Sequence, residues 1–152
     1  MTLYEVFLIL HNIVRWIVVL AGIAAAVKAI IGWAGSRDWN SSDRQLGLLF
    51  TVSLDVQVLI GLLLYFVLSP LTTSNFANFG EAMGNPDTRF FLVEHIAIMV
   101  VALVLAHVGR SLSKKATADQ DKHRRAAIFF TLAIVAILLA IPWAGRPLLR
   151  LG

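Results

Sequence analysis

Four long apolar stretches dominate the amino-acid sequence, and shorter polar segments separate them. The stretches run over about residues 3–31, 46–68, 90–108 and 126–143. A helix needs roughly 20 residues, at about 1.5 Å rise per residue, to cross a hydrocarbon core about 30 Å thick. Each stretch is therefore long enough to cross a bilayer as one helix. The pattern predicts an all-α membrane protein, a single domain over residues 1–152 whose four transmembrane helices form an up-down-up-down bundle.

Composition and charge agree with this interpretation. The chain is 59% hydrophobic and 14% charged, whereas about a quarter of the residues in an ordinary soluble domain are charged. It contains no cysteine, which excludes disulfides, thiolate metal sites and cysteine nucleophiles. The net charge of +4 reflects how Lys and Arg are distributed among membrane loops, so we expect no nucleic-acid partner.

The positions of Lys and Arg predict the orientation, because these residues stay preferentially on the cytoplasmic side of a membrane. Nine of the 13 flank the first and third connections, and four lie toward the other surface. We therefore expect both termini and the middle loop, residues 69–88, to lie outside. Helix breakers punctuate that loop, and between them aromatic and Met side chains recur at helical spacing: Phe76, Phe79 and Met83. This pattern predicts a short amphipathic helix on the outer interface.

Ionisable side chains inside the predicted spans are the candidates for a functional site. Such groups are costly in a bilayer, so they normally face the bundle interior and have a partner. Apart from histidines, the main candidates are Arg15 in the first span, Asp55 in the second and Glu94 in the third, while the fourth span has no ionisable residue between 126 and 143. We expect these three side chains to be buried, and Arg15 to pair with Asp55. That pair would be either a structural connection between two helices or part of a proton or substrate site.

His11 and His95 are predicted to lie at one depth in the outer half of the membrane. They follow the outer starts of their spans by eight and five residues, which corresponds to roughly 12 and 8 Å. The first and third spans run in the same direction and face each other across a four-helix bundle. Two imidazoles placed in this way are what a six-coordinate b-type haem needs, so we interpret His11 and His95 as axial ligands of one haem b.

Further residues can be assigned roles around this haem. Arg89 and Arg146 lie toward the outer surface and are expected to contact the anionic haem propionates. His107 follows His95 by 12 residues, which turns it about 120° around the helix; it is a secondary candidate for proton transfer or a quinone headgroup. No second histidine pair lies at its depth, so one haem per chain is the most that the sequence supports, and haem iron is the only metal expected. His123 lies in a basic loop and is expected to be solvated.

Three segments carry a resemblance to a known group of proteins: Leu10-His11-Asn12-Ile13-Val14-Arg15-Trp16, Arg89-Phe90-Phe91-Leu92-Val93-Glu94-His95 and His107-Val108-Gly109-Arg110-Ser111. They resemble segments of small four-helix bacterial membrane proteins labelled cytochrome b-like, and the resemblance covers nearly the whole chain. It implies a haem-bearing or quinone-associated electron-transfer module, with His11 and His95 matching the ligand positions. It also implies a multi-pass protein of the bacterial cytoplasmic (inner) membrane.

The sequence therefore predicts a membrane-embedded b-type haem electron-transfer subunit. We expect it to be linked to quinone and to belong to a larger respiratory or photosynthetic assembly, rather than to be a complete enzyme. Two alternatives stay open: a structural or assembly subunit without a cofactor, and a proton-coupled transport protein for a small solute that uses Arg15, Asp55, Glu94 and His95. Under each interpretation the chain contacts the lipid bilayer and either other membrane subunits or further copies of itself.

Overall fold

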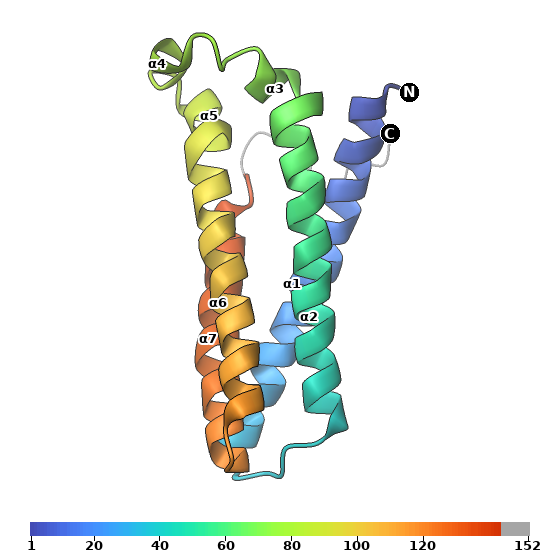
Figure 1. Cartoon of the computed structure of the whole chain (residues 1–152), viewed down its shortest axis with the longest axis vertical. Coiled ribbons are helices and arrows are strands. Elements are labelled where there is room, and N and C mark those ends of the chain that lie inside the picture. Colours follow the sequence, from blue (N-terminus) through green and yellow to red (C-terminus); the bar gives the residue numbers. More distant parts are fainter. Residues whose placement is uncertain (144–152) are drawn as a thin grey trace.

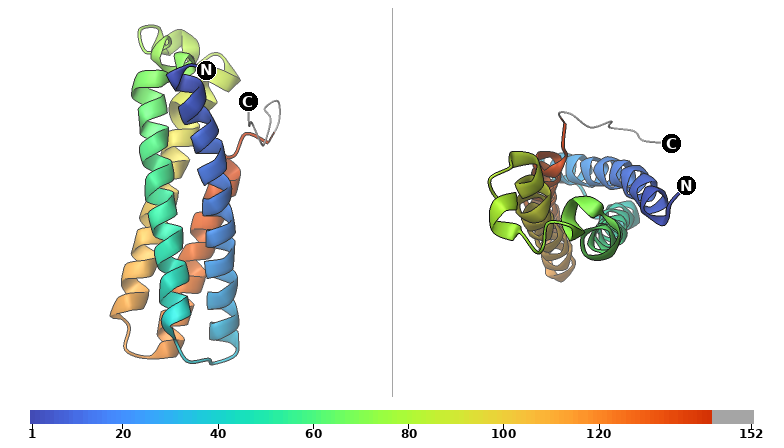
Figure 2. Two further views of the ribbon diagram at one scale, coloured as in Figure 1. Left: turned by 90° about the vertical axis from the view of Figure 1, so that its right-hand side faces the viewer. Right: turned by 90° about the horizontal axis from the view of Figure 1, so that it is seen from above.

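Four long helices form the body of the computed structural model, which describes residues 1–143 (Figure 1). They are α1 (Leu3–Ala34), α2 (Ser41–Leu63), α6 (His95–Lys115) and α7 (Asp119–Ala140). Consecutive long helices run in opposite directions (Figure 2). Helix α1 packs against α2 and α7, and α6 packs against α7 and α2, so that α1 and α6 are diagonal to each other. The prediction of an all-helical bundle is confirmed for the described residues.

Short helical elements join α2 to α6 at one end of the bundle (Figure 1). Two of them are π-helical turns that continue the long helices, and three are single α-helical turns. In chain order they are η1 (Leu64–Leu68), α3 (Pro70–Thr73), α4 (Phe79–Ala82), α5 (Pro86–Arg89) and η2 (Phe90–Glu94). The expected amphipathic helix in the middle loop is thus replaced by separate turns. The reason is local: Asn78, which lies between Phe76 and α4, has a non-helical conformation, so the segment forms only one helical turn.

Helices α2 and α7 begin before the apolar stretches that predicted them, and α7 ends at Ala140 rather than at residue 143. Helix α2 begins at Ser41, where the Asn40 side chain accepts a hydrogen bond from the Ser42 backbone N–H. The Asp43 carboxylate in turn accepts one from the Asn40 N–H, which completes a capping box. Helix α7 begins at Asp119, and its acidic first turn suits the positive end of the helix dipole.

The surface of the bundle is that of a multi-pass membrane protein. Within residues 1–143, four helical segments are long and apolar enough to cross a membrane: 3–34, 41–68, 86–115 and 119–140. Large apolar side chains such as Leu20, Leu59, Val104 and Leu139 are more than half exposed on the outside of the bundle. Lipid rather than water surrounds such a surface, so their exposure carries no hydrophobic cost.

Candidate functional site

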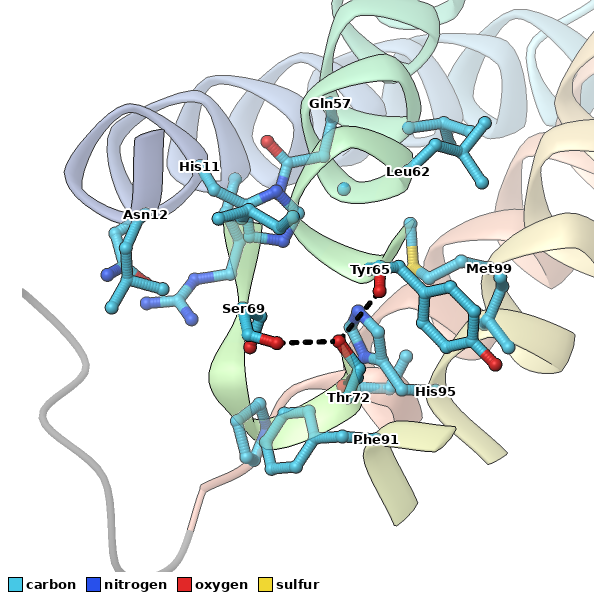
Figure 3. A pocket seen from close by; sticks show the side chains of 18 of the residues that line it. His11, Asn12, Gln57, Leu62, Tyr65, Ser69, Thr72, Phe91, His95 and Met99 are labelled. Carbon is cyan, nitrogen blue, oxygen red and sulfur yellow. Dashed lines mark hydrogen bonds between the residues drawn. The ribbon is translucent and has the colours of Figure 1, made fainter. Parts of the chain in front are cut away.

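A pocket lies inside the half of the bundle that contains the N-terminal part of α1 (Figure 3). Its volume is about 210 Å³ and it is partly open. All four long helices and η1 contribute to its wall, which is largely apolar with a few polar groups. Its polar and sulfur-containing lining residues include His11, Asn12, Arg15, Gln57, Tyr65, Thr72, His95 and Met99.

The structure brings His11 and His95 together in this pocket. Their ring centroids are 6.4 Å apart, and the ring planes make an angle of 63°. His11 comes from α1 and His95 is the first residue of α6, so the rings approach from helices that are diagonal in the bundle. The constant rise of an α-helix explains why depth counted along the sequence placed them together.

His95 is held by the C-terminal end of α7. Its Nδ1 lies 2.9 Å from the carbonyl oxygen of Ala140. That carbonyl is available because α7 ends at Ala140, where Ile141 has an extended conformation and precedes Pro142. A carbonyl oxygen can only accept a hydrogen bond, so Nδ1 is the donor. In the neutral ring, the lone pair is then on Nε2, the atom that remains for a metal ion.

His11 occupies a site that the neighbouring helix leaves open for it. A Cβ atom at Gly61 of α2 would lie 3.2 Å from Cε1 of His11, so only glycine leaves the ring this much room. The Nδ1 atom of His11 and Oε1 of Gln57 are buried and form no hydrogen bond within the described residues, although the backbone of Gln57 lies close enough to the imidazole to interact with it. Buried polar atoms normally have a partner, so these two atoms indicate water or a ligand in the pocket.

The two π-helical turns are linked at the edge of this pocket. The hydroxyl of Tyr65 in η1 donates a 2.8 Å hydrogen bond to the carbonyl of Leu92 in η2. The hydroxyl of Thr72 donates to the carbonyl of Tyr65 at 2.7 Å. Because His95 directly follows η2, these bonds contribute to its position. π-Helical turns inside longer helices are frequent at functional sites.

Arg89 and Glu94 form an exposed ion pair instead of reaching the pocket. Arg89 Nε lies 2.8 Å from Glu94 Oε1, and the two side chains are 46% and 44% exposed. Neither lines the pocket, so the expectation that Glu94 is buried was wrong. The π-helical turn explains the pairing, since its i→i+5 geometry brings positions five apart together. Arg146, the other predicted propionate partner, lies outside the described residues.

Asp55 pairs with His107, not with Arg15. Its Oδ1 lies 2.7 Å from Nε2 of His107, and the side chains are 42% and 44% exposed. The expectations of a buried Asp55 and of an Arg15–Asp55 pair were therefore wrong. The rotation of α2 explains this result. Gln57 is buried and faces the interior of the bundle, and Asp55, two residues earlier, is turned about 200° away from it around the helix. Arg15 lines the pocket near His11, while Asp55 and His107 lie on the outer face of α2 and α6.

We expect the Asp55–His107 pair to stabilise the protein in the membrane. Asp55 lies near the middle of a membrane-crossing segment. His107→Leu would leave its carboxylate without a partner, and we expect thermal unfolding to show a loss of up to about 3 kcal/mol, the cost of a charged group at that depth. The double variant D55L/H107L should recover most of the loss.

Val104→Leu, a change at an exposed apolar position of the same helix face, is the control and should leave the unfolding temperature unchanged. A double variant less stable than His107→Leu alone would contradict this account of the pair.

Several residues of the pocket were not predicted from the sequence. Gln57 and Gly61 are four residues apart and share one face of α2, a pattern that was visible but ambiguous. The sequence does not predict the role of Tyr65, because its hydrogen bond depends on the two π-helical turns. It does not predict the role of the Ala140 carbonyl either, because that role depends on where α7 ends. His123 was expected to be solvated, but it is 1% exposed.

Comparisons with known proteins do not assign a family. No protein-family model, curated protein or solved structure matches this chain. Within the described residues, no group of three or more His, Cys, Asp or Glu side chains is placed to hold a metal ion. The site is therefore interpreted from its own chemistry, and the likeness to cytochrome b-like proteins stays a resemblance.

Proposed function

We propose that this protein is a membrane-embedded electron-transfer subunit that holds one b-type haem between His11 and His95. The observation that carries the proposal is the 6.4 Å separation of the two imidazole centroids. A metal–imidazole bond is about 2.0–2.1 Å long, so two imidazoles that bind one ion from opposite sides have centroids roughly 6 Å apart. The centroid spacing of the pair is therefore compatible with two imidazoles that hold one iron.

The surroundings of the two rings support this assignment. The hydrogen bond from His95 to the Ala140 carbonyl is the kind of outer contact that holds a metal-binding imidazole in one tautomer and orientation. The unpartnered buried atoms of His11 and Gln57 indicate that a further group belongs in the space. The volume of about 210 Å³ is small against the roughly 300–1,000 Å³ of ligand pockets, so the proposal requires the macrocycle to occupy the open side of the pocket as well.

Each residue of the pocket would have a distinct task. Haem supplies reversible one-electron chemistry when it is bound. His11 and His95 would hold the iron, and the Ala140 carbonyl would keep His95 oriented. Arg15 places a positive charge in the pocket and would offset the negative charge of the propionates. Apolar side chains such as Leu62 and Met99 would exclude water.

The proposal extends to orientation and partners. The α1–α2 and α6–α7 connections lie at the end of the bundle opposite α3, α4 and α5 (Figure 1), and most of the Lys and Arg residues flank them. We place that end in the cytoplasm and the pocket in the outer half of a bacterial cytoplasmic membrane. A single haem must receive an electron and pass it on, so a quinone and other subunits of a larger assembly are the proposed partners.

The test is an absorption spectrum of the detergent-purified protein, produced in cells supplied with a haem precursor. We expect a dithionite-reduced minus oxidised spectrum of the b type, and a pyridine haemochrome assay should give about one haem per chain. A colourless, folded protein would overturn the proposal and favour a structural or assembly subunit. A transport site built from Arg15, Asp55, Glu94 and His95 has less support, because Asp55 and Glu94 lie outside the pocket.

A further inference from the structure

A second cavity is lined by residues from the end of α1 and the beginning of α2. These two helix ends lie at the end of the bundle away from α3, α4 and α5 (Figure 1). The volume of the cavity is about 350 Å³. His123 of α7, the charged residues Lys28, Arg37, Asp38 and Asp43, and part of the outer surface of α1 line it. None of these residues belongs to the His11–His95 pocket, so this cavity requires a separate explanation.

His123 is the unusual residue of this cavity. It is 1% exposed, and the Trp39 ring lies 4.8 Å from it, centroid to centroid. A Cβ atom at Gly32 would overlap the imidazole, so α1 passes directly against the ring. Both ring nitrogens are buried and have no hydrogen-bond partner within residues 1–143. An unsatisfied buried nitrogen is costly, and the cavity is the place from which a polar partner can reach this side chain.

The charges around the cavity are balanced. Lys28 Nζ lies 3.3 Å from Oδ1 of the buried Asp43, whose other oxygen accepts the Asn40 N–H, so this carboxylate is satisfied within the protein. Arg37 and Asp38 are exposed, and neither forms an ion pair with a residue in the described part of the chain. One positive and one negative group thus remain for a ligand, a pattern that favours a zwitterion over a simple anion.

The cavity also adjoins the lipid-facing surface of the bundle. Val27 and Ile31 of α1 line it and are 48% and 46% exposed. Trp33, which is exposed on the same turn of α1, is typical of the membrane–water interface. Basic pockets between transmembrane helices on the cytoplasmic side bind the phosphate-bearing headgroups of anionic lipids, and the acidic Asp38 in this cavity adds a site for a positive group.

We propose that this cavity binds the headgroup of a phospholipid that carries both a phosphate and a primary ammonium group. The phosphate would contact Arg37, and the ammonium would contact Asp38. His123 would hydrogen-bond to the headgroup and so satisfy a ring nitrogen, while the acyl chains would lie along the exposed apolar face of α1. This inference does not depend on whether the other pocket holds haem.

Native mass spectrometry of the full chain tests the proposal. The detergent-purified protein is incubated with an equimolar mixture of phosphatidylethanolamine, phosphatidylcholine and phosphatidylglycerol that have identical acyl chains. We expect preferential retention of phosphatidylethanolamine, since phosphatidylcholine lacks the N–H donors and phosphatidylglycerol lacks the positive charge. Arg37→Gln and His123→Phe should each reduce its retention roughly tenfold, because each removes a hydrogen bond that involves a charged group.

Lys115→Gln removes an exposed cation at the same end of the bundle and should leave retention unchanged. Arg37 is exposed, so its variant remains informative even if His123→Phe folds poorly. Equal retention of the three lipids, preference for phosphatidylglycerol, or a lack of effect of Arg37→Gln would overturn the proposal. A parallel experiment with free phosphoethanolamine distinguishes a soluble ligand from a lipid. If that compound stabilises the protein against unfolding while no lipid is retained, the proposal of a lipid site is contradicted.

Discussion

Replacing either His11 or His95 with alanine should abolish the reduced-minus-oxidised absorption of the purified protein. Each imidazole would help to hold the haem iron: the two ring centroids lie 6.4 Å apart, and no other histidine among the described residues lines the pocket. We expect a haem content below about a tenth of the wild-type value, measured by pyridine haemochrome on the monodisperse fraction from size-exclusion chromatography.

Substitutions at the other histidines provide the matched controls. His107 lies on the outer face beside Asp55 and His123 lies in the second cavity, so alanine at either position should leave the haem spectrum intact. His95→Met is a further variant, because a thioether can still bind the iron and should raise the reduction potential rather than abolish binding. Equal loss of haem in all four alanine variants would contradict the assignment of His11 and His95.

Gly109→Leu should strongly destabilise the bundle. Helices α6 and α7 meet at this position, and a Cβ atom on Gly109 would lie 2.5 Å from the Cβ of Phe129. Leucine has a better helix propensity than glycine by about 1 kcal/mol, but the overlap involves an atom next to the backbone, which side-chain rotation cannot move. We expect the free energy of unfolding to fall by about 3 kcal/mol or more, measured by thermal or denaturant unfolding in detergent.

Gly80→Leu is the control for this substitution. Gly80 lies in α4, and nothing would lie within 4 Å of a Cβ atom there, so the same change should alter stability by less than about 0.5 kcal/mol. If the two variants unfold at the same temperature, close contact between α6 and α7 at Gly109 does not contribute to stability in the way that the structure indicates.

The sequence predicted the parts of this protein that depend on one helix at a time. The thickness of a bilayer sets the length of a span, so runs of apolar residues were enough to locate α1, α2, α6 and α7. The rise per residue of a helix is constant, so counting from the ends placed His11 and His95 at one depth. The helix ends were less well located, because capping groups such as Asn40 extend α2 into polar sequence.

Properties that depend on how one helix is rotated against another were decided only by the tertiary structure. Asp55 and Gln57 are both polar and lie on opposite faces of α2, and packing determined that Gln57 faces the interior while Asp55 meets His107. The π-helical turn before His95 changed the phase of the helix and paired Arg89 with Glu94.

The same distinction applies to His123 and to the orientation of His95. The position of His123 in a run of basic residues does not predict that Gly32 leaves room for its ring against α1. The sequence around Pro142 likewise does not predict that the carbonyl of Ala140 contacts His95. The sequence by itself determined the number of long helices and the common level of His11 and His95 along them, because these follow from local helix geometry and the thickness of the bilayer. Only the tertiary structure decided the partner of each polar group, because side-chain packing between helices sets their rotation.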